Sequence, residues 1–377
     1  MRFPEFSGEW KCTTIGNIGD IKNGPFGSVL HAEDYVENGI PIVTTEHFKT
    51  GLMPSDKFGI PQVSNEDYIR LKGYRLETND IVFSRVGSVD INAHVGIEQN
   101  GWLFSGRVLR VRPKYDIDSL FLHYALSTEA VKRDIRNRAV GQTMPSINTP
   151  ILSSTTIQLP KDLFEQKKVA HFLRLLDERI ITQNKIIEDL KKLKSAIRKM
   201  IFTSLKNEHT ENCEINQLLA YEQPSEYIVT NDEYSADTTL TPVLTANKGF
   251  VLGYTNENFG IYKKGECIIF DDFTMDAKYV SFPFKVKSSA IKILTAKPNV
   301  NLRFMFEYLS YLELKSEEHK RHYISEIASL IIELPSKEKQ SRIAYLMTSL
   351  DNKLVLEENT MARYMDEKQY ILSQMFI

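Results

Sequence analysis

Apolar residues form two long stripes along the chain, each close to a heptad pattern. The first, in residues 161–207, contains Leu173, Leu176, Ile180, Ile187, Leu190 and Ile197, and the second, in residues 336–377, contains Leu350, Leu354, Met361 and Ile371. Each stripe predicts a helix of about 40 residues, or about 60 Å at 1.5 Å per residue. Because such a helix cannot be buried in one small domain, we expect each copy to pack against the other.

The remaining sequence predicts two globular parts of mixed α/β structure. In residues 1–160 we expect strands at 40–45, 80–84 and 107–112, followed by a helix at 120–136. Residues 208–335 repeat this order, with strands at 241–245, 266–270 and 290–294 and a helix at 303–315. The loops between these segments differ almost completely. A shared scaffold with different loops is expected of two binding modules with different targets.

A repeat with an offset of 174 residues relates the two halves. After Leu159-Pro160 come Gln166, Ala170, Leu176 and Asp177, and after Leu334-Pro335 come Gln340, Ala344, Leu350 and Asp351. The period is too long for a solenoid and divides the chain into domains at 1–160 and 208–335, each followed by a long helix, at 161–207 and 336–377. If the first helix leads away from the first domain, the second must run back. The expected fold is therefore α+β, with two α/β domains separated by an antiparallel coiled coil of pseudo-two-fold symmetry.

The charge of the chain is unevenly distributed. Its net charge is -2, with 12 basic and 6 acidic residues in 161–207, 17 and 18 in 1–160, and 12 and 19 in 208–335. A protein that bound DNA alone would usually be more basic, so a DNA-binding role favours partners that supply positive surface. We see no signal peptide and no run of about 18 apolar residues, and the three distant cysteines suit a reducing cytoplasm. We therefore expect a cytoplasmic protein.

The duplicated signature, Leu-Pro then Gln-x-x-Ile/Val-Ala then Leu-Asp, resembles that of type I restriction-modification specificity (S) subunits. The resemblance covers essentially the whole chain. It implies a non-catalytic subunit whose two target recognition domains read a bipartite, asymmetric sequence in double-stranded DNA. It also implies two modification methyltransferase subunits and restriction motor-nuclease subunits as partners. S-adenosylmethionine, ATP and Mg²⁺ would belong to those partners and not to this chain.

Residues that read base edges should be donors and acceptors on loops. In the first domain the candidates are Arg85, Arg136, Arg138, Gln142 and Thr143, and in the second they are Gln223, Thr245, Asn247, Lys248 and Lys278. The ten stripe residues named above are the candidates for the coiled coil and for contact with partners. We expect no catalytic residue and no metal ligand.

Two other functions remain open at this stage. The sequence lacks a methyltransferase (N/D)PP(Y/F) motif and a GxxxxGK(S/T) nucleotide loop. However, Asp271, Asp272, Asp276 and Lys278 could hold Mg²⁺ in a small DNA endonuclease. The chain could also be a coiled-coil scaffold without DNA specificity. Cleavage by the purified chain would identify the nuclease, and loss of DNA specificity after loop exchange would exclude the scaffold.

Overall fold

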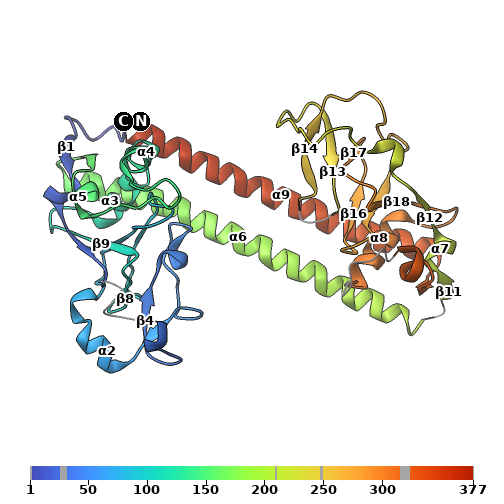
Figure 1. Cartoon of the computed structure of the whole chain (residues 1–377), viewed down its shortest axis with the longest axis horizontal. Helices are drawn as coiled ribbons and strands as arrows, with labels where there is room; N and C mark the ends of the chain where they lie inside the picture. The colour runs from blue at the N-terminus through green and yellow to red at the C-terminus, as the bar shows by residue number, and fades with distance from the viewer. Residues whose placement is uncertain (1, 26–31, 209, 247–248, 315–322, 377) are drawn as a thin grey trace. The chain divides into compact units, whose positions relative to one another are not determined.

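The computed structural model describes residues 2–25, 32–208, 210–246, 249–314 and 323–376 (Figure 1). They form two compact units. Unit 1 comprises Met1–Thr182 and Met361–Ile377, and unit 2 comprises Gln183–Thr360. Each unit therefore combines a globular part with one portion of each long helix. Within the described residues, no helix is both long and apolar enough to cross a membrane.

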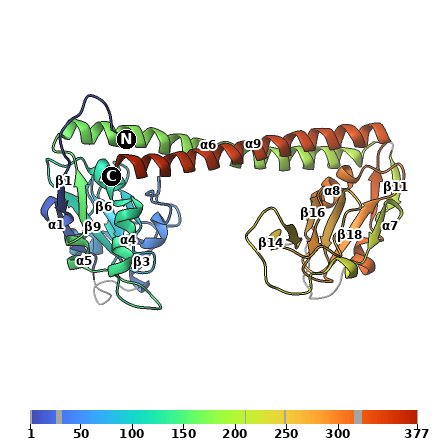
Figure 2. The same cartoon turned by 90° about the horizontal axis from the view of Figure 1, so that it is seen from above.

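The two long helices are α6 (Leu163–Leu205) and α9 (Lys337–Met375). Neither contains glycine or proline, so nothing in the backbone interrupts them. They run antiparallel inside each unit (Figure 2), as the pairs joining them show: Asp177–Lys368 and Arg179–Tyr364 in unit 1, and Gln183–Glu357 and Lys194–Asp351 in unit 2. The two apolar stripes are therefore covered by one another and by the globular parts.

Gln166 and Gln340, which recur at equivalent positions of the repeat, make the same hydrogen bonds in the two units. Gln166 is buried, accepts a hydrogen bond from the Asp118 backbone and donates one to the Pro160 carbonyl, both at 2.9 Å. Gln340 is also buried, and it binds the Asn301 backbone and the Pro335 carbonyl at the same distances. Buried backbone groups without partners are costly. Each glutamine therefore ties the start of its long helix to the globular part.

The central sheets of the two units have the same strand order. Unit 1 has β2-β9-β6-β7 and unit 2 has β12-β18-β15-β16, with every neighbouring pair antiparallel. Their bounds, in that order, are Gly19–Asn23, Val108–Pro113, Ile81–Ser84 and Asn92–His94, then Leu219–Glu222, Ile291–Ala296, Cys267–Asp271 and Ala277–Val280. The middle strands β6 and β15 are buried along their whole length, which explains their nearly continuous apolar sequence.

The smaller sheets also correspond between the units. Unit 1 has β3-β5-β4-β8 and β1-β10, while unit 2 has β14-β13-β17 and β11-β19. Their bounds, in that order, are Tyr35–Val36, Gln62–Val63, Ile40–Val43, Leu103–Phe104, Lys11–Thr14 and Thr156–Leu159, then Val251–Thr255, Thr241–Leu244, Lys285–Val286, Glu211–Glu214 and Ile331–Leu334. The β4–β8 and β13–β17 pairs are parallel. The duplication seen in the signature therefore extends through the globular parts.

Short helices complete both units. They are α1 (Ile15–Ile18), α2 (Asn65–Arg70), α3 (Ser119–Leu126), α4 (Glu129–Arg138), α5 (Thr149–Ser153), α7 (Ile215–Leu218) and α8 (Leu302–Tyr311), with 3₁₀ turns at Ala32–Asp34, Thr45–Phe48, Lys72–Tyr74 and Ser225–Tyr227 and a π turn at Tyr323–Ile327. The prediction of one helix over 120–136 is wrong. Thr128 is extended and its hydroxyl donates to the Ala125 carbonyl at 2.8 Å, so α3 ends and α4 begins at this point.

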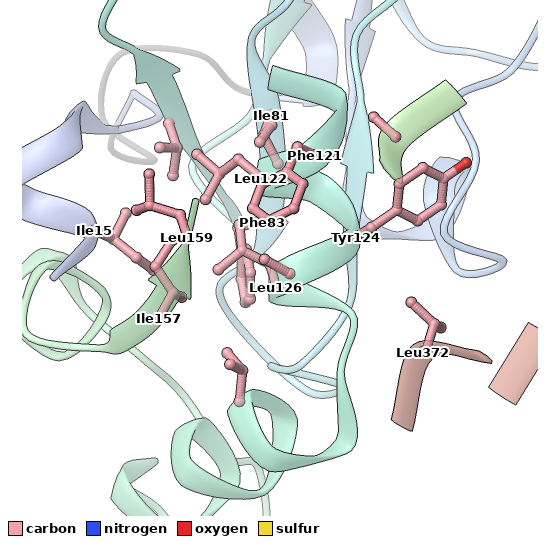
Figure 3. Close-up of a cluster of buried hydrophobic side chains, with 14 of the residues drawn as sticks. Ile15, Ile81, Phe83, Phe121, Leu122, Tyr124, Leu126, Ile157, Leu159 and Leu372 are labelled. Carbon is pink, nitrogen blue, oxygen red and sulfur yellow. The ribbon is translucent and has the colours of Figure 1, made fainter. Parts of the chain in front are cut away.

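The core of unit 1 joins its sheet to the long helices. Figure 3 shows Ile81 and Phe83 of β6 close to Phe121, Leu122 and Leu126 of α3, with Leu372 of α9 to one side. Leu173 and Leu176 of α6 belong to the same cluster. Burial of each such side chain stabilises the fold by roughly 1.5–3 kcal/mol. The helices are therefore part of the domain core, and they do not merely tether the domains.

Candidate nucleic-acid interface

Three segments of unit 1 meet at one edge of the central sheet. The Arg85 N–H, just after β6, donates to the Arg107 carbonyl at 2.9 Å, just before β9. The Ile147 N–H donates to the Arg85 carbonyl at 2.9 Å, and the Gly87 N–H to the Pro145 carbonyl at 2.8 Å. We call this meeting point of residues 84–87, 105–107 and 140–147 the corner of unit 1. It brings Arg85 beside the loop that carries Gln142 and Thr143.

The corner of unit 1 is cationic. The Arg85 guanidinium is partly exposed and donates to the Gly106 carbonyl at 3.0 Å. Arg107 is exposed, and within the part of the chain that the structure describes it has no ion pair. Arg107 was not among the candidates predicted from the sequence, because it was expected to begin a strand. Two arginines whose backbones are paired in this way suit contact with phosphate oxygens.

A short hairpin projects from this corner. Val140 and Ser146 exchange two backbone hydrogen bonds, at 2.9 and 2.8 Å, and Gly141 between them has φ +101°. Gln142 and Thr143 at the tip are exposed, and neither has a hydrogen-bond partner among the described residues. Both side chains are therefore free to bind another molecule.

The other two candidates of unit 1 are occupied by contacts within the unit. Arg136 pairs with Asp90 at 2.5 Å and also with Glu129, and these hydrogen bonds raise the pKa of its guanidinium. Arg138 pairs with Asp134 and donates to the Ser154 hydroxyl at 2.8 Å. These arginines fix the end of α4 below the hairpin. Their predicted role in DNA binding stays a prediction.

The candidates of unit 2 are not brought together in this way. Gln223 is exposed just beyond β12 and accepts a hydrogen bond from Lys292 at 3.0 Å. Lys278 is half-buried on β16, at the opposite edge of the sheet, and Thr245 is buried. The remaining two candidates, Asn247 and Lys248, lie outside the described residues.

The corresponding corner of unit 2 carries acidic residues. The Asp272 N–H donates to the Ala290 carbonyl at 2.9 Å, as Arg85 does to Arg107 in unit 1. The Asp272 carboxylate is buried, accepts from the Tyr323 N–H at 2.8 Å and lies 3.4 Å from the Lys292 ammonium. An arginine pair in one unit thus corresponds to a buried aspartate and an alanine in the other.

The acidic cluster considered for a nuclease holds the backbone in place. Asp271 is buried and accepts hydrogen bonds from the N–H groups of Phe273 and Thr274, both at 2.9 Å. Asp272 faces inward as described above, whereas Asp276 is exposed. Among the described residues, no three His, Cys, Asp or Glu side chains are placed to hold a metal ion. The geometry of this cluster gives the nuclease hypothesis no support.

The coiled-coil candidates all lie on the covered sides of the long helices. Five are buried, namely Leu173, Leu176, Ile187, Leu354 and Ile371, and five are half-buried, namely Ile180, Leu190, Ile197, Leu350 and Met361. Exposed apolar residues occur on the same helices, namely Phe164, Leu175, Ile181, Ile186, Leu193 and Met200 on α6 and Tyr345, Leu346, Val355, Leu356, Met365 and Tyr370 on α9. The helices therefore also present apolar surface to solvent.

Part of the positive charge of α6 is used inside unit 2. Glu307 of α8 is fully buried, and its carboxylate lies 2.8 Å from Arg198, 2.7 Å from Arg303 and 3.6 Å from Lys194. Lys194 also pairs with Asp351 at 2.5 Å. A buried carboxylate requires such compensation. These three cations are therefore not free to bind DNA phosphates.

Comparison with known proteins identifies a family. A family model described as the type I restriction modification DNA specificity domain matches residues 7–192 and again residues 207–363. The two matches correspond to the two halves of the repeat. Together they cover most of the chain.

Two curated relatives show the extent of the similarity. The EcoR124I/EcoR124II specificity subunit of Escherichia coli is 39% identical over 172 residues, which are 41% of this chain and 41% of the relative. The putative MjaX specificity subunit of Methanocaldococcus jannaschii is 27% identical over 405 aligned positions, which cover 98% of this chain and 93% of the relative. The chain thus spans less than half of the first relative and nearly all of the second.

Solved structures share the fold. The type I restriction-modification S subunit of M. genitalium superposes with a TM-score of 0.64 at 16% identity, over 100% of this chain and 99% of that one. A chain of another type I restriction-modification system gives a TM-score of 0.58 at 13% identity, over 99% of this chain and 98% of that one. At such identities the similarity establishes the fold alone.

Proposed function

Because the chain belongs to the family of type I restriction-modification DNA specificity proteins, we propose that it selects the DNA sequence on which such a complex acts. In this proposal each unit reads one half of a bipartite, asymmetric target in double-stranded DNA. The observation that carries it is one scaffold used twice with different chemistry at the same corner. Arg85 and Arg107 lie where unit 2 has Asp272 and Ala290.

The proposed partners are two methyltransferase subunits and restriction motor-nuclease subunits. The exposed apolar residues of α6 and α9 support a role for these helices in subunit contact. Ile186, Leu193 and Met200 recur every seven residues and therefore lie on one face of α6, and an exposed apolar surface shared by several side chains is typical of a partner interface. We assign S-adenosylmethionine, ATP and Mg²⁺ to those partners. The chain would then contribute the choice of sequence and no bond-making step.

Exchange of one domain tests this function. Residues 208–335 are replaced by the corresponding segment of a relative with a different target, and the methylated motif is read by methylome sequencing in a host that supplies the methyltransferase. We expect one half of the motif to change and the other half to be retained, because each unit has its own core.

Two controls make the exchange decisive. The host without this chain should lack the motif altogether, and the unaltered chain should restore it. A change in both halves at once would show that the units do not read independently. A motif that is independent of the chain would contradict the proposal and favour a scaffold without DNA specificity.

A further inference from the structure

The hairpin at the corner of unit 1 has the properties of an element that reads DNA. We propose that its tip, Gly141–Met144, enters a groove of duplex DNA, where Gln142 and Thr143 bind base edges and Met144 makes apolar contact. Arg107, with Arg85 beside it, binds the adjacent phosphates. The inference rests on the proposed function and assigns residues to the half of the target that unit 1 reads.

Backbone hydrogen bonds hold the base of the hairpin. Its base is closed by the Val140–Ser146 hydrogen bonds, and its second strand is held to residues 85–87 by two more. A β-carbon at Gly141 would lie 2.7 Å from the Met144 carbonyl oxygen, so only glycine fits this tight turn. A hairpin whose base is already held in place loses less conformational entropy on binding than a free loop would, which favours precise recognition.

The tip presents chemistry that suits base edges. Gln142 offers one acceptor and two donors, the set that pairs with adenine in the major groove, and Thr143 offers a hydroxyl and a methyl group. Both are exposed and have no partner in the described part of the chain. If the tip bound only phosphates, the side-chain amide of Gln142 would not be needed, so this residue favours contact with bases.

Apolar side chains flank these polar groups. Val140 and Met144 are each 65% exposed. Burial of these two apolar side chains against a partner would remove their apolar surface from water, which is favourable. Thymine methyl groups and base faces are the apolar surfaces that DNA offers to such side chains.

Charge identifies duplex DNA as the occupant and limits the assignment to unit 1. Arg107 is exposed beside Arg85, and a guanidinium pair next to a groove-reading tip complements the phosphate backbone. At the corresponding corner of unit 2, Asp272 is buried and Ala290 has no charge. Arg85 and Arg107 are therefore specific to the corner of unit 1 and are not part of the scaffold that the two units share.

Three single substitutions test the assignment in the assembled methyltransferase complex. We expect Gln142→Ala to weaken discrimination at one base pair of one half of the motif, by roughly 5- to 150-fold, and Met144→Ala to affect the same half. Arg107→Ala should weaken binding to all sequences alike. It should also reduce the slope of log K against log salt concentration by about 0.9, since one phosphate contact is lost.

Matched controls separate recognition from general surface effects. Tyr115→Ala removes a side chain of unit 1 that is 98% exposed, and Lys161→Ala removes an exposed cation of the same unit. Both should leave the motif and the salt slope unchanged. Circular dichroism of each variant establishes that it is folded.

The outcomes separate this inference from the function on which it rests. If folded Gln142→Ala and Met144→Ala complexes keep the wild-type motif and discrimination, the hairpin does not read DNA, although the chain still selects the sequence. If Arg107→Ala keeps the wild-type salt slope, Arg107 does not bind a DNA phosphate and that part of the assignment is wrong. If the wild-type motif does not depend on the chain, the proposed function fails, whatever the hairpin variants do.

Discussion

The burial of the His123 side chain, on α3, should make the stability of unit 1 depend on pH. Its Nδ1 lies 2.7 Å from the Asn92 side-chain oxygen, while the Asn92 amide nitrogen donates to Ser127. Because an amide oxygen only accepts, the Nδ1–H of His123 donates this hydrogen bond. Burial lowers the pKa of His123 to about 3. In the unfolded chain the pKa returns to about 6.5.

This shift predicts that unit 1 loses stability in mild acid. As the pH falls below about 6.5, the unfolded chain binds a proton that folded His123 cannot accept. The free energy of unfolding therefore decreases by about 1.4 kcal/mol per pH unit from this group, or roughly 2 kcal/mol between pH 6.5 and pH 5. Both tryptophans of the chain, Trp10 and Trp102, belong to unit 1, so tryptophan fluorescence during urea unfolding reports on this unit.

A comparison of two variants isolates the effect. His123→Gln should lose roughly 2 kcal/mol less than wild type between pH 6.5 and pH 5, whereas His171→Gln, at an exposed position of α6, should follow wild type. Burial also lowers the pKa of His47 and His94, so part of the pH dependence will remain in His123→Gln. Equal losses in His123→Gln and wild type would contradict this account.

The recurring glutamines give a second prediction about individual residues. Gln166→Ala should leave the part-buried Asp118 N–H and the buried Pro160 carbonyl without partners, at a cost of up to roughly 2–6 kcal/mol for the two groups. The exposed Gln369 provides the control, and Gln369→Ala should change the free energy of unfolding by less than about 0.5 kcal/mol. The measurement is urea unfolding followed by tryptophan fluorescence, and a small effect of Gln166→Ala would show that water satisfies both groups.

The sequence was informative about these residues to different degrees. The repeat marked Gln166 and Gln340 because one tertiary contact occurs in both halves, so a single sequence contains the comparison. Arg107 was not recognised, because its place beside Arg85 follows from the pairing of β6 with β9. The burial of Asp272 likewise depends on contacts with Tyr323 and Lys292, which lie far away in the sequence.

At the scale of elements, the two long helices have matching spacings. Asp177 and Lys194 on α6, which pair with Lys368 and Asp351, are 17 residues apart, and so are Asp351 and Lys368 on α9. One extra heptad in α6 between Asp177 and Lys194 keeps the phase of the stripe but destroys this equality. We expect this variant to lose about 2 kcal/mol for each buried Leu or Ile that loses its partner.

A second heptad in α9, between Asp351 and Lys368, should restore the match. Thermal unfolding followed by circular dichroism at 222 nm would compare wild type with the singly and doubly lengthened chains. The doubly lengthened chain should unfold close to wild type and the singly lengthened chain well below it. Equal stability of the two lengthened chains would mean that the helix register does not matter.

Elements with a strong period were predictable, and elements that depend on local polar contacts were not. The predicted fold, with two α/β domains and two long antiparallel helices, is confirmed. It could be predicted because the apolar stripes are long and lack glycine and proline. The strands at 80–84 and 266–270 correspond to β6 and β15, whose apolar runs are buried. The division of 120–136 into α3 and α4 was missed, because the hydroxyl bonds of Ser127 and Thr128 compete with the helix.

For the whole molecule, the resemblance inferred from the duplicated signature is confirmed by the family to which the chain belongs. That membership also confirms the prediction of a type I DNA specificity protein, while the absence of catalysis belongs to the proposed function. The DNA-contacting residues, the domain limits and the partner subunits stay predictions. The signature could identify the family because it records the packing of helix against domain. It could not identify the bases, because those depend on loops that the two halves do not share.

The cationic corner of unit 1 has a consequence for how fast, and from which side, a target is found. Long-range attraction between charges speeds association and weakens as salt is added. The globular part of unit 1, residues 1–160, contains 17 basic and 18 acidic side chains and carries the partly exposed Arg85 and the exposed Arg107. The globular part of unit 2, residues 208–335, contains 12 basic and 19 acidic side chains. If the chain reads DNA as proposed, the first encounter should therefore begin at the globular part of unit 1, and the half of the target assigned to unit 2 should be bound afterwards. The two half-sites would then be bound in a fixed order. The half-site of unit 1 would be bound first, and the half-site of unit 2 would decide whether the complex stays on the DNA.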